Sequence, residues 1–563
     1  MAAASIPVSA RERTAALILL GAATLLRLPY IFHYRINSDE PQHLHVVWGW
    51  TRGLLQYRDV SDNHSPLFHL LMAPLLALIG ERPDAVVLMR FAIVPLALLA
   101  LWLTYAIATR LFDRRVALWS AVLVAFHYNF FFKSIEFRTD NLWTVGWLAA
   151  LAVLVGGPLG AGRALLTGVA LGTNLCVSQK TALMVAALAG GAALVAALSA
   201  EVRRAVPFRR AASLAGAAAA GFAVAPLAVA GFFASKGALG AFIQGALAQN
   251  VLADLGAWHD AWRLMLFPLG LVLVIWFLLP RLRVAGGDRI RVQRLLIPLV
   301  AVLYVLVLES LWPLVTGQDY LPVFPLAAIV VAAGLDRWER MSIERAGDGA
   351  PLTRSPAYVL LAVLVAQSGV IVFKGSVWRD RTVQQKNLVS NVLRLTDRDD
   401  PVMDTKGETV FRKRPFFDVL ETITIEKLRR GLIQDTIAED IVRARCFVAV
   451  EDSSRFPNRG RTFMNENFVS VGILRVAGRL LPPAGGGALH MRFAIAIPGP
   501  YAVVTPAGAA AGSLDGATYS GPRELEAGSH DFIPTAGLQP FAVVWARAIE
   551  RGYSPFAADR SPS

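Results

Sequence analysis

The sequence predicts an all-α polytopic membrane bundle followed by a soluble α/β domain, and three observations support this. Hydrophobic residues make up 55% of the chain, charged residues only 17%, and the mean hydropathy is +0.50. Such values are typical of helical membrane proteins. Apolar runs long enough to cross a bilayer recur up to about residue 373 and then stop. Arginine clusters separate these runs at intervals, as cytoplasmic loops require.

We expect about eleven transmembrane helices in residues 1–373, with the amino terminus in the cytoplasm. The first apolar run is too long for a signal-peptide core, so we interpret it as a retained span. The arginine clusters then fall on one side of the membrane, among them Arg110 with Arg114 and, near the last span, Arg340 with Arg354. The expected spans are residues 15–31, 91–108, 116–132, 142–155, 164–177, 181–198, 211–233, 265–279, 295–315, 321–333 and 357–373.

One further apolar segment, residues 66–79, lies between the first and second expected spans. It is shorter than the roughly 20 residues that a crossing needs. We therefore expect an interfacial or re-entrant helix there.

Residues 374–563 change character and should form an extracytoplasmic α/β domain. Helical patterning covers residues 384–395 and 417–429, and residues 402–404 and 446–450 resemble short buried strands. From about Met491 short β runs, such as residues 493–497 and 541–545, alternate with proline and glycine turns, which predicts a small terminal sheet. The two cysteines, Cys176 and Cys446, lie in different parts of the chain, and we expect no disulfide.

The net charge of +14 is not a nucleic-acid signature. Most of the excess lies within residues 1–373, where the charge of the loops sets the orientation of the spans. We therefore expect membrane lipids, and no nucleic acid, among the partners. The predicted location is the cytoplasmic (inner) membrane, crossed several times.

The polar residues that could carry chemistry lie at the outer ends of the expected spans. The acids are Asp39 and Glu40 in the first outer loop and Asp140 in the second, with Arg138 beside it and Lys180 further along. A carboxylate can act as a general base towards a hydroxyl, and a lysine or arginine can stabilise charge on a phosphate leaving group. This distribution favours a reaction at the outer face, because a transporter should keep polar groups near the bilayer midplane.

Five short motifs follow one another through residues 15–335. They are Asp39-Glu40, then His64-Ser65-Pro66-Leu67, then Arg138-Thr139-Asp140, then the glycine-rich run from Gly172 to Lys180-Thr181, and finally Tyr320-Leu321-Pro322-Val323-Phe324-Pro325. In this order they resemble the GT-C glycosyltransferases, in the branch (families 39 and 83) that holds the protein O-mannosyltransferases and the lipid A aminoarabinose transferase.

The resemblance implies transfer of a sugar from a polyprenyl-phosphate donor to a hydroxyl of a lipid, glycan or protein acceptor, with inversion, on the outer face of the membrane. It would make Asp39 the base, with Glu40 beside it and Asp140 as its partner in the cavity. The donor would be bound by Lys180, Arg138, His64 and Tyr320. Two features depart from the family pattern. His64 stands where many relatives have lysine, and no lysine or arginine lies between Lys236 and Arg263.

Each assignment has a plainer alternative. Lys180 could extend to the interface from a helix end, and Arg138 could form a structural bridge with a neighbouring acid. The spacing of the histidines in the first outer loop matches no tight metal-binding motif. A divalent ion held by Asp39 and Asp140 is a better alternative than a histidine site, because hard ions prefer oxygen ligands. For the whole chain, the alternatives are a transporter or flippase of lipid-linked sugars and a relative that has lost catalysis.

Overall fold

The computed structural model describes residues 8–250, 261–285, 288–312, 314–346, 355–451, 454–481, 490–535 and 539–556. Its contacts divide the chain into two compact units. The first comprises residues 1–35, 63–71 and 87–381, and the second comprises residues 36–62, 72–86 and 382–563. The domain boundary at residues 373/374 stays a prediction. Arg354, one of the arginines assigned to an inner loop, lies outside the described residues.

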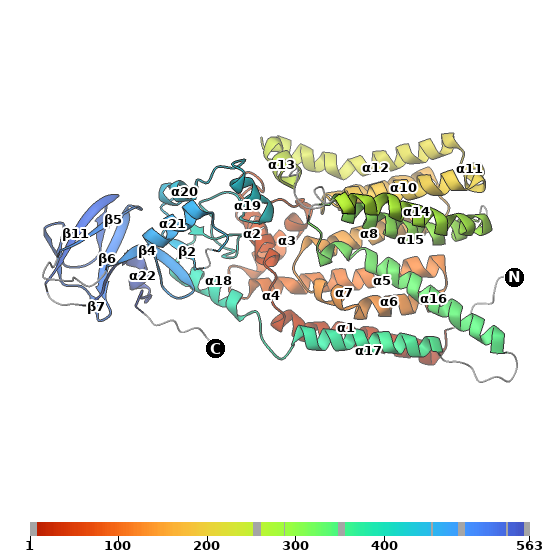
Figure 1. Cartoon of the computed structure of the whole chain (residues 1–563), viewed down its shortest axis with the longest axis horizontal. Helices are drawn as coiled ribbons and strands as arrows, with labels where there is room; N and C mark the ends of the chain where they lie inside the picture. The colour runs from red at the N-terminus through yellow and green to blue at the C-terminus, as the bar shows by residue number, and fades with distance from the viewer. Residues whose placement is uncertain are drawn as a thin grey trace. The chain divides into compact units, whose positions relative to one another are not determined.

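The first unit is a helical bundle, and every expected span overlaps a helix in it (Figure 1). By length and composition, seven helices of the described residues could cross a membrane. The predicted fold class is confirmed. The eleven helices that correspond to the expected spans are α1 (Ala10–His33), α5 (Val94–Leu111), α6 (Arg114–Phe126), α8 (Thr139–Val155), α9 (Ala161–Leu175), α10 (Thr181–Leu198), α12 (Phe208–Ser235), α14 (Ala261–Ala285), α15 (Arg289–Leu311), α16 (Val323–Ala346) and α17 (Ser355–Gly375).

Short helices connect these long ones. The expected span 116–132 is interrupted at His127, whose backbone is extended and whose side chain accepts a hydrogen bond from the backbone of Phe130. The expected short helix at residues 66–79 is present as a 13-residue helix. The short elements are α3 (Leu67–Ile79), α4 (Ala85–Arg90), η1 (Phe91–Ile93), α7 (Tyr128–Lys133), α11 (Ala200–Ala205), α13 (Leu239–Ala246), η2 (Ala248–Asn250) and η4 (Gly317–Tyr320).

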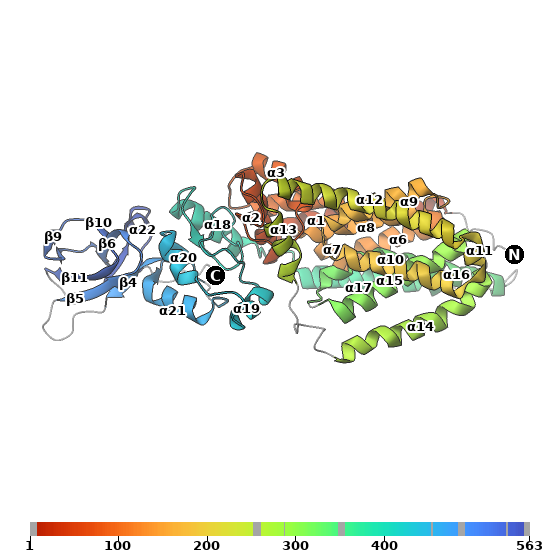
Figure 2. The same cartoon turned by 90° about the horizontal axis from the view of Figure 1, so that it is seen from above.

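Glycines allow α9 and α12 to pack backbone against backbone (Figure 2). A Cβ atom on Gly168 would lie 2.0 Å from the carbonyl oxygen of Ala218, and one on Gly172 would lie 2.1 Å from that of Phe222. Larger residues would force the helices apart, as at other small-residue interfaces in membranes. The glycine-rich run therefore fixes the helix that leads into the Lys180 turn.

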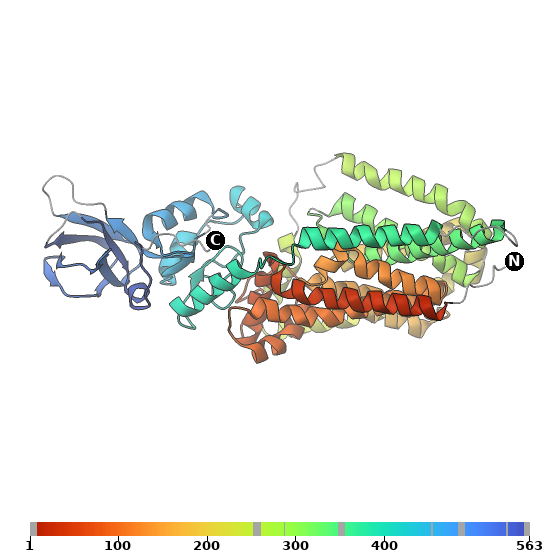
Figure 3. The same cartoon turned by 90° about the horizontal axis from the view of Figure 1, so that it is seen from below.

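The first and last long helices of the bundle, α1 and α17, lie side by side (Figure 3). The hydroxyl of Tyr30 on α1 donates a hydrogen bond of 2.8 Å to the carbonyl of Ile371 on α17. Gly375 ends α17 against the ring of Tyr30, where a Cβ atom would lie 2.3 Å from Cε1. The last helix is thus bound to the first, and the chain then leaves the bundle.

The second unit combines helices with two sheets. One sheet has eight strands in the order β1-β2-β4-β12-β6-β10, with β3 paired to β4 and β7 paired to β6, and the other has the order β5-β11-β8-β9. The elements are α2 (Asp39–Thr51), α18 (Val383–Leu395), β1 (Val402–Met403), α19 (Thr422–Arg429), α20 (Ile437–Arg443), β2 (Val448–Val450), α21 (Asn458–Asn467), β3 (Phe468–Ser470), β4 (Leu474–Leu481), β5 (Met491–Ile495), β6 (Gly499–Thr505), β7 (Gly508–Ala509), β8 (Gly512–Leu514), β9 (Ala517–Tyr519), β10 (Arg523–Leu525), β11 (Gly528–Pro534), β12 (Phe541–Trp545) and α22 (Ala546–Glu550).

The central strand β12 is buried along its whole length, between β4 and β6. Two details differ from expectation. The strands expected at residues 402–404 and 446–450 are present as β1 and β2, but β3 and β4 also form before Met491, and the sheet is larger than the small terminal sheet that was predicted. The helix expected at residues 417–429 begins only at Thr422, because the backbone N–H of Leu420 donates to the carbonyl of Thr405 instead of to a helical turn.

Candidate active site

Asp140 lies in the first turn of α8, and its side chain is buried. The guanidinium of Arg138, the residue that precedes the helix, donates from Nε to Asp140 Oδ2 at 3.0 Å. The positive end of the helix dipole also favours a carboxylate at this position. Arg138 therefore does form the structural bridge that was given as an alternative. The same contact holds the carboxylate of Asp140 in place.

Lys180 lies in the turn between α9 and α10. Its ammonium forms an ion pair with Asp319 and lies 3.8 Å from Asp140 Oδ1. The side chain is only 18% exposed, and the ring centroid of Trp143 lies 5.7 Å from the nitrogen. Lys180 is therefore held among carboxylates and an aromatic ring, and it does not extend to an interface as the snorkelling alternative requires.

Asp319 is a buried carboxylate of this cluster that the sequence analysis missed. It belongs to η4, where its Oδ2 accepts hydrogen bonds from the backbone N–H and the hydroxyl of Thr316 at 2.7 and 2.9 Å. Its other oxygen faces Lys180. The signal was available, because Asp319 directly precedes the Tyr320-Leu321-Pro322 motif at the start of an apolar run.

Two further charges complete the group. The ammonium of Lys133 contacts the buried carboxylate of Glu136 at 2.9 Å, and Arg138 Nε lies 4.0 Å from the same carboxylate. The amide of Asn141 donates to the backbone carbonyls of both Lys133 and Glu136. We call the following six residues the Lys180 cluster: Lys133, Glu136, Arg138, Asp140, Lys180 and Asp319. Three cations thus balance three carboxylates in a mostly buried site.

The segment around His64 is bound to the Lys180 turn. The side-chain amide of Gln179 donates to the backbone carbonyl of Asn63 at 2.9 Å. The backbone N–H of Leu67 donates to the backbone carbonyl of Cys176 at 3.0 Å. His64 lies close enough to Asp140 to act on its carboxylate electrostatically. The structure therefore brings His64, Arg138, Asp140 and Lys180 together, although they come from three separate parts of the chain.

Tyr320 follows Asp319 at the end of η4. Its hydroxyl donates a hydrogen bond to the carboxylate of Glu309 near the end of α15. The hydroxyl of Tyr304 donates to the backbone carbonyl of Asp319 at 3.0 Å. Tyr320 is thus adjacent in the chain to a member of the Lys180 cluster, while its own side chain is bound to α15.

Asp39 and Glu40 belong to the second unit, where they begin α2. Glu40 is fully buried, and its Oε1 accepts a hydrogen bond of 2.8 Å from the backbone N–H of Asn37. Asp39 is 21% exposed and forms an ion pair with Lys406. The two adjacent carboxylates therefore have different surroundings, and Asp39 is the more accessible of them. Lys406 is a second residue that the sequence analysis missed, since nothing in the sequence links it to Asp39.

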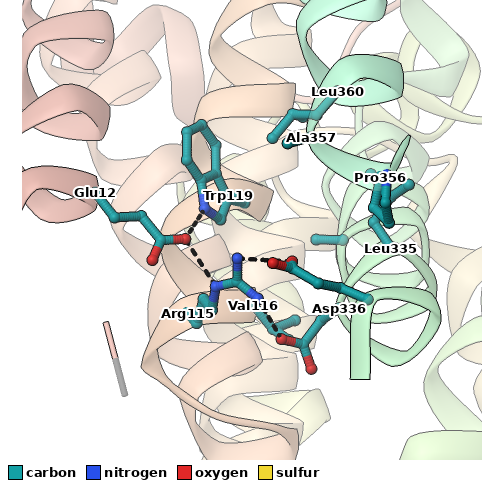
Figure 4. A pocket seen from close by; sticks show the side chains of 11 residues that line it. Glu12, Arg115, Val116, Trp119, Leu335, Asp336, Pro356, Ala357 and Leu360 are labelled. Carbon is teal, nitrogen blue, oxygen red and sulfur yellow. Dashed lines mark hydrogen bonds and ion pairs between the residues drawn. The ribbon is translucent and has the colours of Figure 1, made fainter. Parts of the chain in front are cut away.

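The opposite end of the bundle holds another charged group, which lines a cavity of about 240 Å³ (Figure 4). Arg115 contacts Glu12 at 2.7 Å, Asp336 at 3.1 Å and Glu339 at 2.8 Å. The indole N–H of Trp119 donates to Glu12. We call the following six residues the Arg115 cluster: Glu12, Asp113, Arg115, Asp336, Glu339 and Arg340. These contacts join the ends of α1, α6 and α16.

The divalent ion stays a prediction. In the described part of the chain, no group of three histidine, cysteine, aspartate or glutamate side chains converges. Asp39 and Asp140, proposed above as ligands of a divalent ion, are each paired with a basic side chain. Both cysteines are buried and free.

Comparisons with known proteins support the interpretation of the bundle. Residues 63–230 match the family model described as dolichyl-phosphate-mannose-protein mannosyltransferase. No curated protein matches the sequence. The fold resembles crystal structures of ArnT from Cupriavidus metallidurans, both in the apo state and bound to undecaprenyl phosphate.

The ArnT structures are 14% identical to this chain, with a TM-score of 0.53. For the undecaprenyl phosphate complex, the match covers 78% of this chain and 94% of ArnT. The apo oligosaccharyltransferase of Archaeoglobus fulgidus is 11% identical, with a TM-score of 0.46, over 89% of this chain and 74% of that one. The resemblance to the GT-C glycosyltransferases is therefore confirmed, by the family model over residues 63–230 and by the fold over most of the chain.

Proposed function

We propose that this multi-pass membrane glycosyltransferase transfers a sugar from a polyprenyl-phosphate donor to a hydroxyl of a lipid, glycan or protein acceptor, with inversion. The observation that carries the proposal is the burial of Lys180 between Asp140 and Asp319. Lys180 and Asp140 lie within the segment that matches the family model, and Asp319 lies outside it. Burying several charges is costly unless they are paired or used. The ArnT crystal structure with undecaprenyl phosphate indicates the kind of lipid that such a fold can bind.

In the proposed reaction, Lys180, Arg138 and His64 bind the donor phosphate, and Tyr320 lines the donor site. The acceptor oxygen attacks the anomeric carbon while the bond from that carbon to the phosphate oxygen breaks. The polyprenyl phosphate leaves with the electron pair, and nearby ammonium and guanidinium groups stabilise the charge it gains. Asp39 accepts the proton of the acceptor hydroxyl, with Asp140 as the second acid of the site.

The proposed location is the cytoplasmic (inner) membrane, with the amino terminus inside, residues 374–563 outside and the reaction on the outer face. Arginine-rich ends of helices support this orientation, since the Arg110 and Arg203 regions both precede outward spans. Reporter fusions after Arg210 and after Lys374 should report opposite compartments. The same compartment for both would exclude the arrangement.

The test of the activity is incubation of the purified protein, in lipid nanodiscs, with a panel of polyprenyl-phosphate sugars and candidate acceptors. Mass spectrometry should detect both a glycosylated acceptor and free polyprenyl phosphate. The alternative function, transport or flipping of lipid-linked sugars, predicts movement of donor across proteoliposomes without a glycosylated product. A relative that has lost catalysis would bind undecaprenyl phosphate and give no product with any donor.

A further inference from the structure

The loop that follows β1, residues 404–414, belongs to the same compact unit as α2. His45 on α2 donates from Nδ1 to the backbone carbonyl of Val410 at 2.7 Å, since a carbonyl can only accept. Burial lowers the pKa of His45 and so favours the neutral ring, which makes this contact in the tautomer that carries the proton on Nδ1. Gly407, with φ of +85°, lies against the same histidine, and a Cβ atom there would lie 3.1 Å from the Cβ of His45. The loop is therefore packed directly on α2.

Hydrogen bonds within the loop fix its conformation. The carboxylate of Asp404 accepts from the backbone N–H groups of Gly407 and Thr409, at 2.8 and 3.0 Å, and from the hydroxyl of Thr409 at 2.6 Å. Arg414 Nε contacts the same carboxylate at 2.8 Å. Such a closed set of contacts around one buried acid is expected to rigidify a loop.

Lys406 lies in this loop, and both its backbone and its side chain are bound. Its backbone N–H donates to Glu408 Oε2 at 2.5 Å, and its ammonium forms an ion pair with Asp39. The two side chains of the pair are only 11% and 21% exposed. The unit thus presents one ammonium to the carboxylate that we propose as the base.

We propose that Lys406 is a positioning residue for Asp39, which keeps this carboxylate ionised and oriented towards the acceptor hydroxyl. The inference rests on the proposed function, in which Asp39 is the general base. A base must be unprotonated before the reaction, and an adjacent ammonium favours the charged carboxylate. During the transfer the proton moves from the acceptor oxygen to Asp39, while Lys406 keeps its own proton, and solvent later removes the proton from Asp39.

The test is a cycle of single and double variants in the full-length protein. The variants are Lys406→Met, Lys406→Arg, Asp39→Asn and the pair Lys406→Met with Asp39→Asn. The matched control is Lys413→Met, an exposed lysine of the same loop. Turnover is measured with the polyprenyl-phosphate sugar that gives product with the wild type, and donor-site integrity is measured as binding of undecaprenyl phosphate.

We expect Lys406→Met to lower kcat about 10- to 100-fold. The variant removes the positioning of the base but not the base itself, whose whole contribution is about 10²- to 10⁴-fold in rate. Binding of undecaprenyl phosphate should change less than threefold, because Lys406 pairs with Asp39 and is not among the residues proposed to bind the phosphate. Lys406→Arg should keep most of the turnover, and Lys413→Met all of it. In the Asp39→Asn background Lys406→Met should cause no further loss of turnover, because the effects of substituting residues that act through one another do not add.

Other outcomes would overturn the proposal in distinguishable ways. If Asp39→Asn abolishes turnover while Lys406→Met does not, Lys406 has no positioning role although the base is correctly assigned. If the two losses multiply in the double variant, Lys406 acts independently of Asp39. Full activity of Asp39→Asn would reject the base itself, and a wild-type protein that uses no donor in the panel would reject the proposed function together with this inference.

Discussion

The bundle has a charged cluster at each end, and the two are built differently. The Arg115 cluster consists mainly of side chains on regular helices and joins α1, α6 and α16. The Lys180 cluster lies instead on turns and at the ends of helices, and it contains Glu136, Asp140 and Asp319, whose side chains are at most 5% exposed. In the Arg115 cluster, the carboxylates of Glu12 and Glu339 are 17% and 32% exposed.

We infer from this difference that the Arg115 cluster mainly stabilises the fold and that the Lys180 cluster serves the proposed chemistry. Ion pairs between partly exposed helix ends contribute modestly to stability and are screened by salt. A more deeply buried set of charges on loops is costly to form and, at membrane depth, is a functional hypothesis by default. The Arg115 cluster has four carboxylates for two arginines, so it is also unsuited to an anionic phosphate.

The largest effect on turnover is expected from substitution of Asp39, and an acid of the Arg115 cluster serves as the control. Asp39→Asn keeps the shape of the side chain but cannot accept a proton, so kcat should fall about 10²- to 10⁴-fold. Asp336→Asn is the control and should leave kcat unchanged. Glu40→Gln should be milder than Asp39→Asn, because Glu40 is buried against the backbone of Asn37. Steady-state kinetics of the three variants in nanodiscs decides between these expectations.

The same kinetics across a titration of divalent ions separates a base from a metal ligand. A general base predicts that Asp39→Asn stays inactive at every ion concentration and that chelation leaves the wild type active. Partial rescue of Asp39→Asn by added Mn²⁺ or Mg²⁺ would instead place an ion at this carboxylate.

The next effect is expected at Lys180. Lys180→Met should weaken donor use by about 1.5–3 kcal/mol, the range for charge-assisted hydrogen bonds. It should also lower stability by about 3–5 kcal/mol, since it leaves the buried carboxylate of Asp319 without its cation. The double variant Lys180→Met with Asp319→Asn removes both charges, so it should recover much of the stability and none of the donor use. Thermal unfolding and undecaprenyl phosphate binding measure the two effects separately.

A smaller effect is expected at the other cluster. Arg115→Met should lower the stability by about 1–2 kcal/mol, a range reduced for the partial exposure of its partners. Donor binding and kcat should not change, because the cluster lies at the opposite end of the bundle from Lys180 (Figure 1). A loss of donor affinity in Arg115→Met, without loss of folded protein, would remove the distinction between the two clusters.

The smallest effect concerns Glu408, a partly buried residue whose carboxylate accepts hydrogen bonds from two neutral donors, the N–H of Lys406 and the hydroxyl of Thr405. Burial and the charge of Asp404 raise the pKa of Glu408. A carboxyl with a raised folded-state pKa binds protons more tightly when folded, so its contribution to stability is present at low pH. That contribution is lost as the pH rises through the unfolded value of about 4.3 towards the folded one.

Glu408→Gln should therefore flatten the fall in melting temperature as the pH rises above about 4.3, the unfolded value. The wild type and the variant are compared by thermal unfolding at several pH values in the same lipid. An unchanged pH slope would show that this carboxyl does not titrate in that range.

The sequence by itself determined the helical bundle, the short α3 helix and the α/β character of the tail. These depend on local apolar periodicity and helix length, which a single segment carries. Asp140 and Lys180 could be recognised because charged residues at span ends are rare and costly. Arg138 was recognisable for the same reason, two residues from Asp140.

Only the tertiary structure decided which distant residues share a site. Lys180 and Asp319 are 139 residues apart in sequence, and Asp39 and Lys406 are 367 residues apart. It also decided that residues 36–62 and 72–86 pack with residues 382–563, as one unit. Such contacts depend on how separate elements pack, and packing is set by the complementary shapes and charges of many residues at once, which no local pattern records.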